Sequence, residues 1–315
     1  MLFRSETVDG SFEDVGQLAL FDGAGEDVPA AAPRLRELVP ISWPTTTRVR
    51  RLSYSAISLH ERCGYRYYAE RVVGLRPAPW QPSTDGEPTG MHPTEIGDAA
   101  HRLLEIVDLE EPVAPGPEAL AAQVHAWYPA ATDAEIERIG GFVRTYCSSD
   151  LARRIASLTG VRPERPFAFE LDDVLVNGRL DVLWRDGDRA LVLDYKTNAL
   201  LDRDPAVIVA EEYLTQQTVY AVACLRAGSS EVEVVYHFLE AADAVVSTVF
   251  TSADSVRLES ALSAAIERIR AGEFRPTPSP FACSGCPALD VVCAGMRLGG
   301  FSETLDEDPV YASAE

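Results

Sequence analysis

Hydrophobic and polar residues follow two different periods along this 315-residue chain. Before residue 160, apolar side chains recur every three or four positions, which is the spacing of an amphipathic helix. Helices are therefore predicted over residues 94–108, 116–127 and 133–158. Residues 1–47 show little periodicity, are acidic and rich in Gly, Ala and Pro, and are predicted to form a linker or loosely held arm.

Another helix is predicted between this arm and the first of those helices. It is expected to begin after Ser55, whose side chain can cap the first turn. Its apolar side comprises four residues at helical spacing: Ala56, Leu59, Cys63 and Tyr67. The stretch PAPWQPSTDGEPTGMHP that follows is predicted to be a loop because of its Pro and Gly content.

After residue 160 the period shortens, and β-type runs are separated by VN and DGD turns. The predicted strands are FAFELDDVL (167–175), GRLDVLWR (178–185), RALVLDYKT (189–197), EVEVVYHFL (231–239) and AVVSTVF (244–250). Two more helices are predicted over 204–226 and 252–272. A helical front, a central sheet and flanking helices predict one α/β domain over residues 48–300, followed by an acidic tail at 301–315.

The charge balance limits the kinds of partner. With 49 Asp and Glu against 28 Lys and Arg, the net charge is −21, which argues against a surface that coats nucleic acid generically. Residues 48–76 differ, because seven arginines and two glutamates are interleaved there with tyrosines. Such a segment suits a phosphate backbone with stacked bases, or else forms a helix whose arginines pair with the acidic remainder.

Membrane and export signals are missing from the sequence. No apolar run reaches the ~18 residues of a membrane span, and the first residues, MLFRSETVDG, lack a signal-peptide pattern. A cytoplasmic protein with no membrane partner is therefore expected. In that reducing compartment the six cysteines are expected to be thiols or metal ligands rather than disulfides.

The segment GRLDVLWRDGDRALVLDYKT is predicted to form a β-hairpin. Gly187-Asp188 can serve as its two-residue turn, a favoured type with Gly first. Counting outward from this turn places Asp181 directly opposite Asp194. A turn one residue earlier would instead place Asp181 opposite Val192, with Asp194 one diagonal step away on the same face.

Lys196 is the only lysine among the 28 basic residues, and it shares a strand face with Asp194. Opposed carboxylates, with Cβ atoms ~5 Å apart, destabilise a sheet unless a positive charge lies between them. Two carboxylates that converge on one point suit Mg²⁺ or Mn²⁺, and the compact charge of a lysine can orient water or stabilise a transition state beside the metal. The alternative is an edge-strand salt bridge between Asp194 and Lys196.

Four short motifs follow one another along the chain. They are GDAAH (Gly97, His101), GRLD (Gly178, Asp181), DYKT (Asp194, Lys196) and QQTVY (Gln216, Tyr220). This succession, over residues 53 to 298, resembles the RecB-like branch of the PD-(D/E)XK nucleases. The resemblance implies a PD-(D/E)XK nuclease core, in which helices flank a central mixed β-sheet.

The resemblance also implies roles for individual residues. The implied ligands of Mg²⁺ or Mn²⁺ are His101, Asp181, Asp194 and the carbonyl of Tyr195. The implied catalytic set joins the two aspartates with Lys196, as catalytic lysine, and with Gln216 and Tyr220, which help to position the substrate strand or the catalytic residues. Glu170, on the preceding strand, is an accessory acidic candidate.

CSGCPALDVVC supplies Cys283, Cys286 and Cys293, a spacing that suggests a metal centre lacking its fourth ligand. Cys63 is the candidate for that ligand. A subset of the RecB-like branch has one cysteine before the nuclease core and three behind it, which implies a [4Fe–4S] cluster in a C-terminal segment bound through its cysteines. Zinc fits four cysteines almost as well, and three incidental thiols are the third possibility. Cys147 and Cys224 are expected to be buried.

The resemblance implies a DNA exonuclease that works in double-strand break repair with a UvrD-like helicase, in cis or in trans. The sequence contains no GxxxxGK[ST] phosphate loop, so a motor activity is not expected of this chain itself. Two alternatives are a stand-alone exonuclease of the CRISPR-associated type and an inactive nuclease fold that binds DNA as a scaffold.

Overall fold

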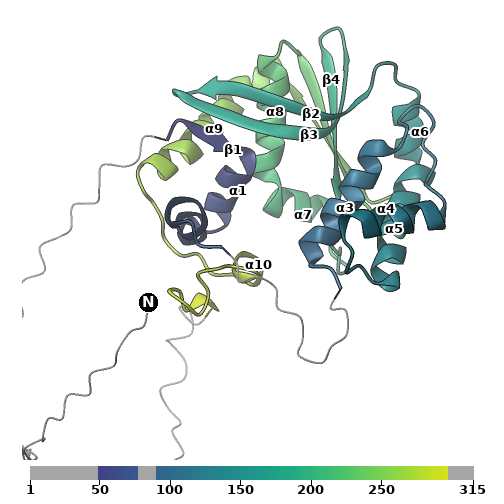
Figure 1. Cartoon of the computed structure of the whole chain (residues 1–315). Coiled ribbons are helices and arrows are strands. Elements are labelled where there is room, and N and C mark those ends of the chain that lie inside the picture. Colours follow the sequence, from purple (N-terminus) through teal and green to yellow (C-terminus); the bar gives the residue numbers. More distant parts are fainter. Residues whose placement is uncertain (1–48, 77–89, 297–315) are drawn as a thin grey trace, which may run out of the picture. The chain divides into compact units, whose positions relative to one another are not determined.

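A mixed β-sheet of six strands lies between two groups of helices in the computed structural model, which describes residues 49–76 and 90–296 (Figure 1). This architecture confirms the predicted α/β fold with a central mixed sheet flanked by helices. The predicted linker over 1–47 and the tail over 301–315 lie outside the described residues. Within the described ranges, no helix combines the length and the apolar character that crossing a membrane requires.

The strands pair in an order that differs from their order in the sequence. They are β1 (Arg51–Ser53), β2 (Arg162–Leu171), β3 (Val174–Asp186), β4 (Arg189–Lys196), β5 (Glu231–Phe238) and β6 (Val245–Thr251). The sheet runs β1-β3-β4-β5-β6, and β2 also pairs with β3. β1 is parallel to β3 and β4 to β5, whereas the other pairs are antiparallel. β4, which carries DYKT, therefore lies in the interior of the sheet.

Most helices of the described chain form two layers, one on each face of the sheet. They are α1 (Tyr54–Arg62), α2 (Gly64–Tyr67), α3 (Pro93–Ile106), α4 (Pro117–Trp127), α5 (Asp133–Ser148), α6 (Asp150–Ala156), α7 (Pro205–Glu212), α8 (Leu214–Arg226), α9 (Ser255–Arg270) and α10 (Pro280–Cys283), with a π-helical turn η1 (Tyr68–Val73) and a 3₁₀ turn η2 (Ser252–Asp254). α3 to α6 bury one face, while α1, α7, α8 and α9 bury the other (Figure 1).

β4 divides its side chains between these two layers. Leu191 and Leu193 are buried against α3 to α6, whereas Ala190 and Val192 are buried against α7 and α8. Successive side chains of a strand point to opposite faces. Asp194 therefore points toward α8, and so does the residue two positions further on. The fold thus brings the DYKT motif against the helix that carries QQTVY.

The predicted turn at VN (176–177) is wrong, because these residues lie within β3. β2 and β3 are joined instead at Asp172 and Asp173, whose φ angles are 51° and 60°. Positive φ at both central residues is the requirement of a type I′ hairpin turn, and Asp tolerates this conformation better than most residues. FAFELDDVL therefore contains the end of one strand and the start of the next.

Two predicted helices are each divided by one residue. The helix predicted over 133–158 breaks at Ser149, whose backbone is extended and whose hydroxyl accepts a hydrogen bond from Ala152 N at 3.0 Å. The helix predicted over 204–226 breaks at Tyr213, between α7 and α8. The predicted cap is shifted as well, since Ser53, and not Ser55, accepts the capping hydrogen bond of α1.

Candidate functional site

The β3–β4 hairpin has the predicted register. Gly187 supplies a positive φ of 58° in the turn, and Asp186 pairs with Arg189. The ladder keeps this register up to the pair immediately before Asp181 and Asp194. These two aspartates are therefore the next pair in register, as the Gly187-Asp188 turn predicts.

The ladder between β3 and β4 ends at this point. The carboxylate of Asp181 accepts a hydrogen bond from the backbone N–H of Tyr195, with Oδ2 at 2.9 Å. Asp181 thereby satisfies a donor that would otherwise pair with a strand carbonyl. The end of the ladder thus brings a carboxylate into the plane of the sheet beside Asp194.

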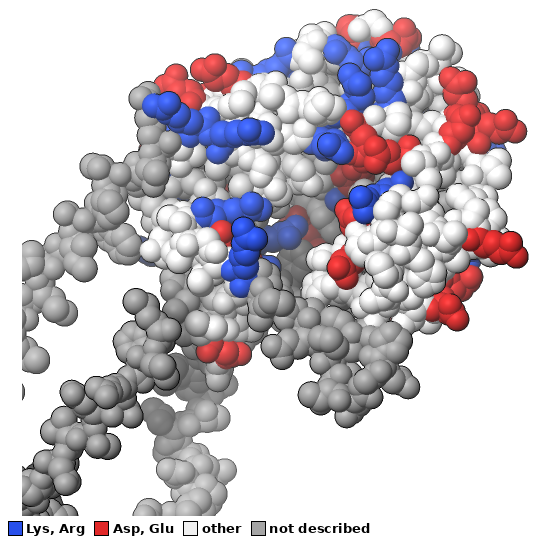
Figure 2. All heavy atoms as spheres, viewed as in Figure 1, with Lys and Arg blue, Asp and Glu red and all other residues white. Residues whose placement is uncertain are grey.

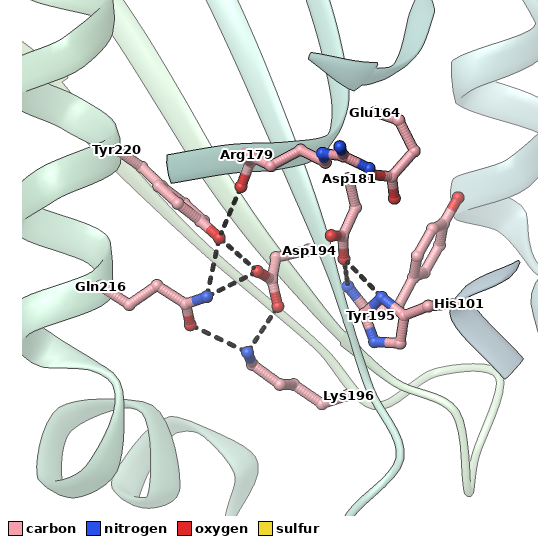
Figure 3. A network of polar contacts seen from close by, with 9 residues as sticks. All are labelled: His101, Glu164, Arg179, Asp181, Asp194, Tyr195, Lys196, Gln216 and Tyr220. Carbon is pink, nitrogen blue, oxygen red and sulfur yellow. Dashed lines mark hydrogen bonds and ion pairs between the residues drawn. The ribbon is translucent and has the colours of Figure 1, made fainter. Parts of the chain in front are cut away.

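A cavity of about 310 Å³ lies at this end of the hairpin. Its lining residues are Tyr54, His101, Arg179, Asp181, Asp194, Tyr195, Lys196, Thr197, Asn198 and Gln216. The close view in Figure 3 shows Asp181 and Asp194 near each other, with the Lys196 side chain reaching Asp194. On the face drawn in Figure 2 the surface is hollowed near its centre, and side chains of both charges lie around the hollow.

Asp194 and Lys196 form a buried ion pair, with Nζ 2.5 Å from Oδ2. Gln216 Nε2 donates to Asp194 Oδ1 at 2.8 Å, and Gln216 Oε1 accepts from Lys196 Nζ at 2.8 Å. The Tyr220 hydroxyl donates to Asp194 Oδ1 at 2.8 Å. Gln216 and Tyr220 are one turn apart on α8, so both reach the pair from the same side (Figure 3). The alternative of an edge-strand salt bridge is correct in the ion pair itself but wrong in its position, because β4 is an interior strand.

Burial and charge oppose each other in this pair. Burial raises the pKa of Asp194 above its ordinary value, against the opposing charge of Lys196. Burial lowers the pKa of Lys196, but the charge and hydrogen bond of Asp194 together with the neighbouring Tyr213 and Tyr54 outweigh burial, so the pKa of Lys196 is raised overall. The charged ammonium is therefore the favoured form of Lys196. Removing one partner of such a pair leaves an uncompensated buried charge, which costs about 3–5 kcal/mol.

His101 reaches Asp181 from α3, in the opposite layer, with Nδ1 3.2 Å from Oδ2. Burial lowers the pKa of His101, but the charge and hydrogen bond of Asp181 and the charge of Asp194 outweigh burial and raise this pKa from 6.5 to about 9. Burial raises the pKa of Asp181, but the charge of His101 and the hydrogen bonds from His101 and Tyr195 lower it overall. The two side chains therefore form an imidazolium–carboxylate pair at neutral pH.

The donor set has the chemistry of a divalent-cation site, because carboxylate oxygens suit Mg²⁺ and Mn²⁺. Asp194 Oδ2 is buried, and among the described residues it has no hydrogen-bond partner beyond its ionic contact with Lys196. However, in the part of the chain that the structure describes, no three His, Cys, Asp or Glu side chains converge as a metal site. The ligand roles of His101, Asp181, Asp194 and the Tyr195 carbonyl therefore stay predictions.

The acidic residue of β2 that lies nearest this site is Glu164, which the sequence did not single out. The β2–β3 register places Glu164 opposite Asp181, although its φ of 49° interrupts the ladder there. Its carboxylate accepts a hydrogen bond from Arg179 at 2.9 Å (Figure 3). Glu170, the accessory candidate, pairs with Leu175 near the other end of β2 and does not line the cavity. The predicted strand began at residue 167, whereas β2 begins at Arg162, so the prediction left Glu164 outside the sheet.

Two motif glycines allow close approaches around the site. A Cβ at Gly97 would lie 3.0 Å from Thr197 Oγ1, so this glycine lets α3 approach the end of β4. A Cβ at Gly178 would lie 2.6 Å from the Phe167 ring and 3.0 Å from the Tyr54 ring. These positions explain why the GDAAH and GRLD motifs begin with glycine, since any larger residue would displace the walls of the site.

The four candidate cluster cysteines lie on segments that pack against each other. Cys63 separates α1 from α2, and its sulfur accepts a hydrogen bond from the backbone N–H of Thr277 at 3.5 Å. The sulfur of Cys293 accepts a hydrogen bond from the backbone N–H of Gly295 at 3.4 Å. All six cysteines are free thiols, and within the described ranges no complete metal-ligand set has formed. Cys224 is buried in a hydrophobic core, as predicted, whereas Cys147 is only partly buried beside another.

Part of the arginine- and tyrosine-rich segment joins the chain near Cys63 to the segment that carries the other three candidate cysteines. Arg66 donates hydrogen bonds to the carbonyls of Ala282 and Ser284 at 2.9 and 2.8 Å. Tyr67 and Tyr68 stack against Phe274, with ring centroids 5.9 and 5.2 Å away. Tyrosines that stack within the protein are not free to stack on bases. Among the tyrosines of this segment, only Tyr54 lines the cavity.

Comparison with known families and proteins gives one extensive match. A family model described as the PD-(D/E)XK nuclease superfamily matches residues 51–293. The match includes each of the four motifs and all four candidate cluster cysteines.

Individual relatives are more distant. The chain is 26% identical over 162 residues to the A subunit of the ATP-dependent helicase/nuclease of Bacillus cereus (strain ATCC 10987 / NRS 248), and 25% identical over 164 residues to its counterpart in Bacillus thuringiensis subsp. konkukian. These alignments cover 44% of this chain but only 13% of the relatives, so the chain corresponds to a small part of their length.

Two solved structures are similar at low sequence identity. A protein from Eubacterium rectale that is described as a proposed exonuclease has 11% identity and a TM-score of 0.46, with 81% of this chain and 94% of that chain covered. SSO0001 has 12% identity and a TM-score of 0.34, with 78% of this chain and 85% of that chain covered.

The Gly178→Ala substitution is expected to destabilise the protein by about 1–3 kcal/mol, because the added methyl group must displace the Phe167 and Tyr54 rings. Urea unfolding measures the effect. Gly141→Ala is the matched control, since its Cβ would meet only a distant arginine atom and alanine favours the helix that contains it. Equal stability of the two variants would contradict this account of the GRLD glycine.

His101 makes the stability of the metal-free protein depend on pH. Its folded pKa of about 9 lies above the ordinary 6.5, so its stabilising contribution is complete below pH 6.5 and is lost as the pH rises through 9. Urea unfolding should show that the wild type loses roughly 1–2 kcal/mol more than His101→Gln across this interval, after allowance for solvent screening. Parallel pH profiles of the two proteins would refute the imidazolium–carboxylate pair.

Proposed function

Because the chain belongs to the PD-(D/E)XK nuclease superfamily, we propose that it is a metal-dependent DNA nuclease, working as an exonuclease. The observation that carries the proposal is the shared cavity of Asp181, Asp194 and Lys196. Gln216 and Tyr220 hold Asp194 there from α8. A buried ion pair usually stabilises a fold no better than apolar side chains of similar volume would. Its presence in the lining of a cavity therefore favours a catalytic role.

In this proposal His101, Asp181, Asp194 and the carbonyl of Tyr195 hold Mg²⁺ or Mn²⁺. The bound metal would lower the pKa of a water molecule and neutralise charge that develops on phosphorus. The charged side chains of the site would set the electrostatic potential around the metal. His101 would have to be a neutral imidazole to hold the metal, and Asp181 would then no longer face an imidazolium.

Lys196 supplies a positive charge that does not depend on the metal. Its ammonium is held between Asp194 and Gln216 and lines the cavity that a phosphodiester would enter. There it can stabilise the additional negative charge of a pentacovalent phosphorus. A guanidinium group is planar and larger, so arginine cannot make these contacts in the same space.

We further propose that the nuclease acts in double-strand break repair, with a UvrD-like helicase in cis or in trans. The similarity to parts of helicase/nuclease proteins supports this context. The alternative of an inactive DNA-binding scaffold is disfavoured by the presence of the two aspartates and the lysine in one cavity.

We also propose that Cys63, Cys283, Cys286 and Cys293 bind a [4Fe–4S] cluster, with zinc as the alternative. Backbone N–H groups that point at sulfur stabilise a thiolate, and Cys63 and Cys293 each have such a donor. Gly64 supports the proposal further, because a Cβ there would lie 2.6 Å from the carbonyl oxygen of Glu273. This close approach brings the chain beside Cys63 next to the segment that leads to the other three cysteines.

Mg²⁺-dependent degradation of linear DNA by the purified protein tests the catalytic assignment. Asp194→Asn and Lys196→Arg are each expected to lower the rate roughly 100-fold or more, because each removes a charge or a contact used at phosphorus. Asp186→Asn, on the same hairpin but with an exposed side chain, is the matched control and is expected to stay within about twofold of wild type. Wild-type rates in Asp194→Asn or Lys196→Arg would refute the assignment, and DNA binding without any cleavage would favour the scaffold.

Anaerobic purification tests the cluster. The protein is expected to be brown with a broad visible absorbance that Cys63→Ser removes and Cys147→Ser retains, because only Cys63 belongs to the proposed ligand set. A colourless protein with stoichiometric zinc would replace the iron–sulfur assignment, and one without either metal would reject the site.

A further inference from the structure

The ammonium group of Lys196 lies over the faces of two aromatic rings. Its Nζ is 4.1 Å from the ring centroid of Tyr213 and 5.3 Å from that of Tyr236. The two rings stack on each other, with centroids 5.7 Å apart and an interplanar angle of 28°. A cation at such a distance from an aromatic face is attracted by the electron-rich ring, most strongly where water is excluded. Two sides of the ammonium are thus occupied by oxygen acceptors, and another side is occupied by an aromatic face.

Tyr213 is fixed in place at both ends. Its backbone joins α7 to α8, since its N–H donates to Val209 O at 3.1 Å and its carbonyl accepts from Gln217 N at 2.9 Å. Its hydroxyl donates to Asn198 Oδ1 at 3.0 Å. Asn198 is itself a lining residue of the cavity. The ring therefore forms a rigid support between the start of α8 and the segment that follows β4.

A long lysine side chain needs such a support. Its stem has four rotatable bonds, and ordering them costs up to about 2 kcal/mol of side-chain entropy. Asp194 and Gln216 contact the ammonium itself, through Oδ2 at 2.5 Å and Oε1 at 2.8 Å. The Tyr213 ring, with its centroid 4.1 Å from Nζ, adds a third contact that limits the movement of the ammonium, so the side chain keeps one orientation.

We propose that Tyr213 is a positioning residue, whose ring holds the ammonium of Lys196 against Asp194 and Gln216 and orients it toward the cavity. The kinetic consequence rests on the proposed nuclease function, whereas the contact itself does not. The ring also accounts for the residue type at position 196. A compact ammonium fits between two acceptors and a ring face, and a guanidinium would have to displace one of them.

Nuclear magnetic resonance can test the contact directly, because Lys196 is the only lysine in the sequence. Protein labelled with ¹³Cε-lysine gives a single side-chain signal, which needs no assignment. The ε-methylene protons are expected to resonate upfield of a free lysine, owing to the ring current of Tyr213. Tyr213→Phe should keep this shift, since it retains the ring, and Tyr213→Leu should lose most of it. Tyr213→Met replaces the leucine variant if the latter unfolds.

The same variants test positioning. Tyr213→Leu is expected to lower kcat for DNA cleavage about tenfold, the scale of a desolvated cation–π contact, with KM changed less than about twofold. Tyr213→Phe should stay within about threefold of wild type, because it loses only the hydrogen bond to Asn198.

Two results would overturn the proposal. An upfield signal that survives in Tyr213→Leu would show that the ring does not hold the ammonium. If Tyr213→Leu loses the upfield shift but keeps the wild-type kcat, the contact is structural and does not position the lysine for cleavage. If the wild type cleaves no DNA while the shift is present and depends on the ring, the positioning contact is supported and the nuclease function fails instead.

Discussion

The ion pair between Asp194 and Lys196 is the constraint on which the rest of the site depends. Both charges lie on an interior strand and are almost completely withdrawn from water, at a cost of several kcal/mol for each ion. Coulombic attraction repays that cost only when the remaining lone pairs and protons also find partners. Gln216 and Tyr220 supply these partners from α8, and this helix must therefore pack at one definite depth and rotation against β4.

The fold meets that requirement because successive side chains of β4 point alternately toward the two helical layers. On one side, β4 contributes Leu191 and Leu193 to the core beneath α3 to α6. On the other, it carries the ion pair toward α8, while the ladder to β3 ends where Asp181 turns to bind Tyr195 N. Each layer then sends one group to the same point, since His101 comes from α3 and Gln216 from α8. Segments more than 100 residues apart are brought together by ordinary sheet packing.

Sequence reasoning succeeds here wherever one residue type decides the geometry. Glycine at 187 determines the turn, and the turn determines the register, so the placing of Asp181 beside Asp194 follows by counting. It fails where two geometries compete. Asp172 and Asp173 form a tight turn without glycine, so the predicted strand crossed them, and because it also began too late at residue 167 it did not include Glu164. Tyr213 lies within an apolar helical pattern, and only tertiary packing shows that it interrupts the helix and contacts the lysine.

The single lysine has a consequence for covalent chemistry. Side-chain amines are the attachment points for acyl groups and for isopeptide-linked tags. In this protein the one such amine is 11% exposed and lies in the cavity beside Asp194. Acylation there would abolish the charge that balances a buried carboxylate, so modification would leave Asp194 as an uncompensated buried charge. The other basic side chains are all arginines, which offer amine-directed enzymes and reagents no lysine that can be modified harmlessly.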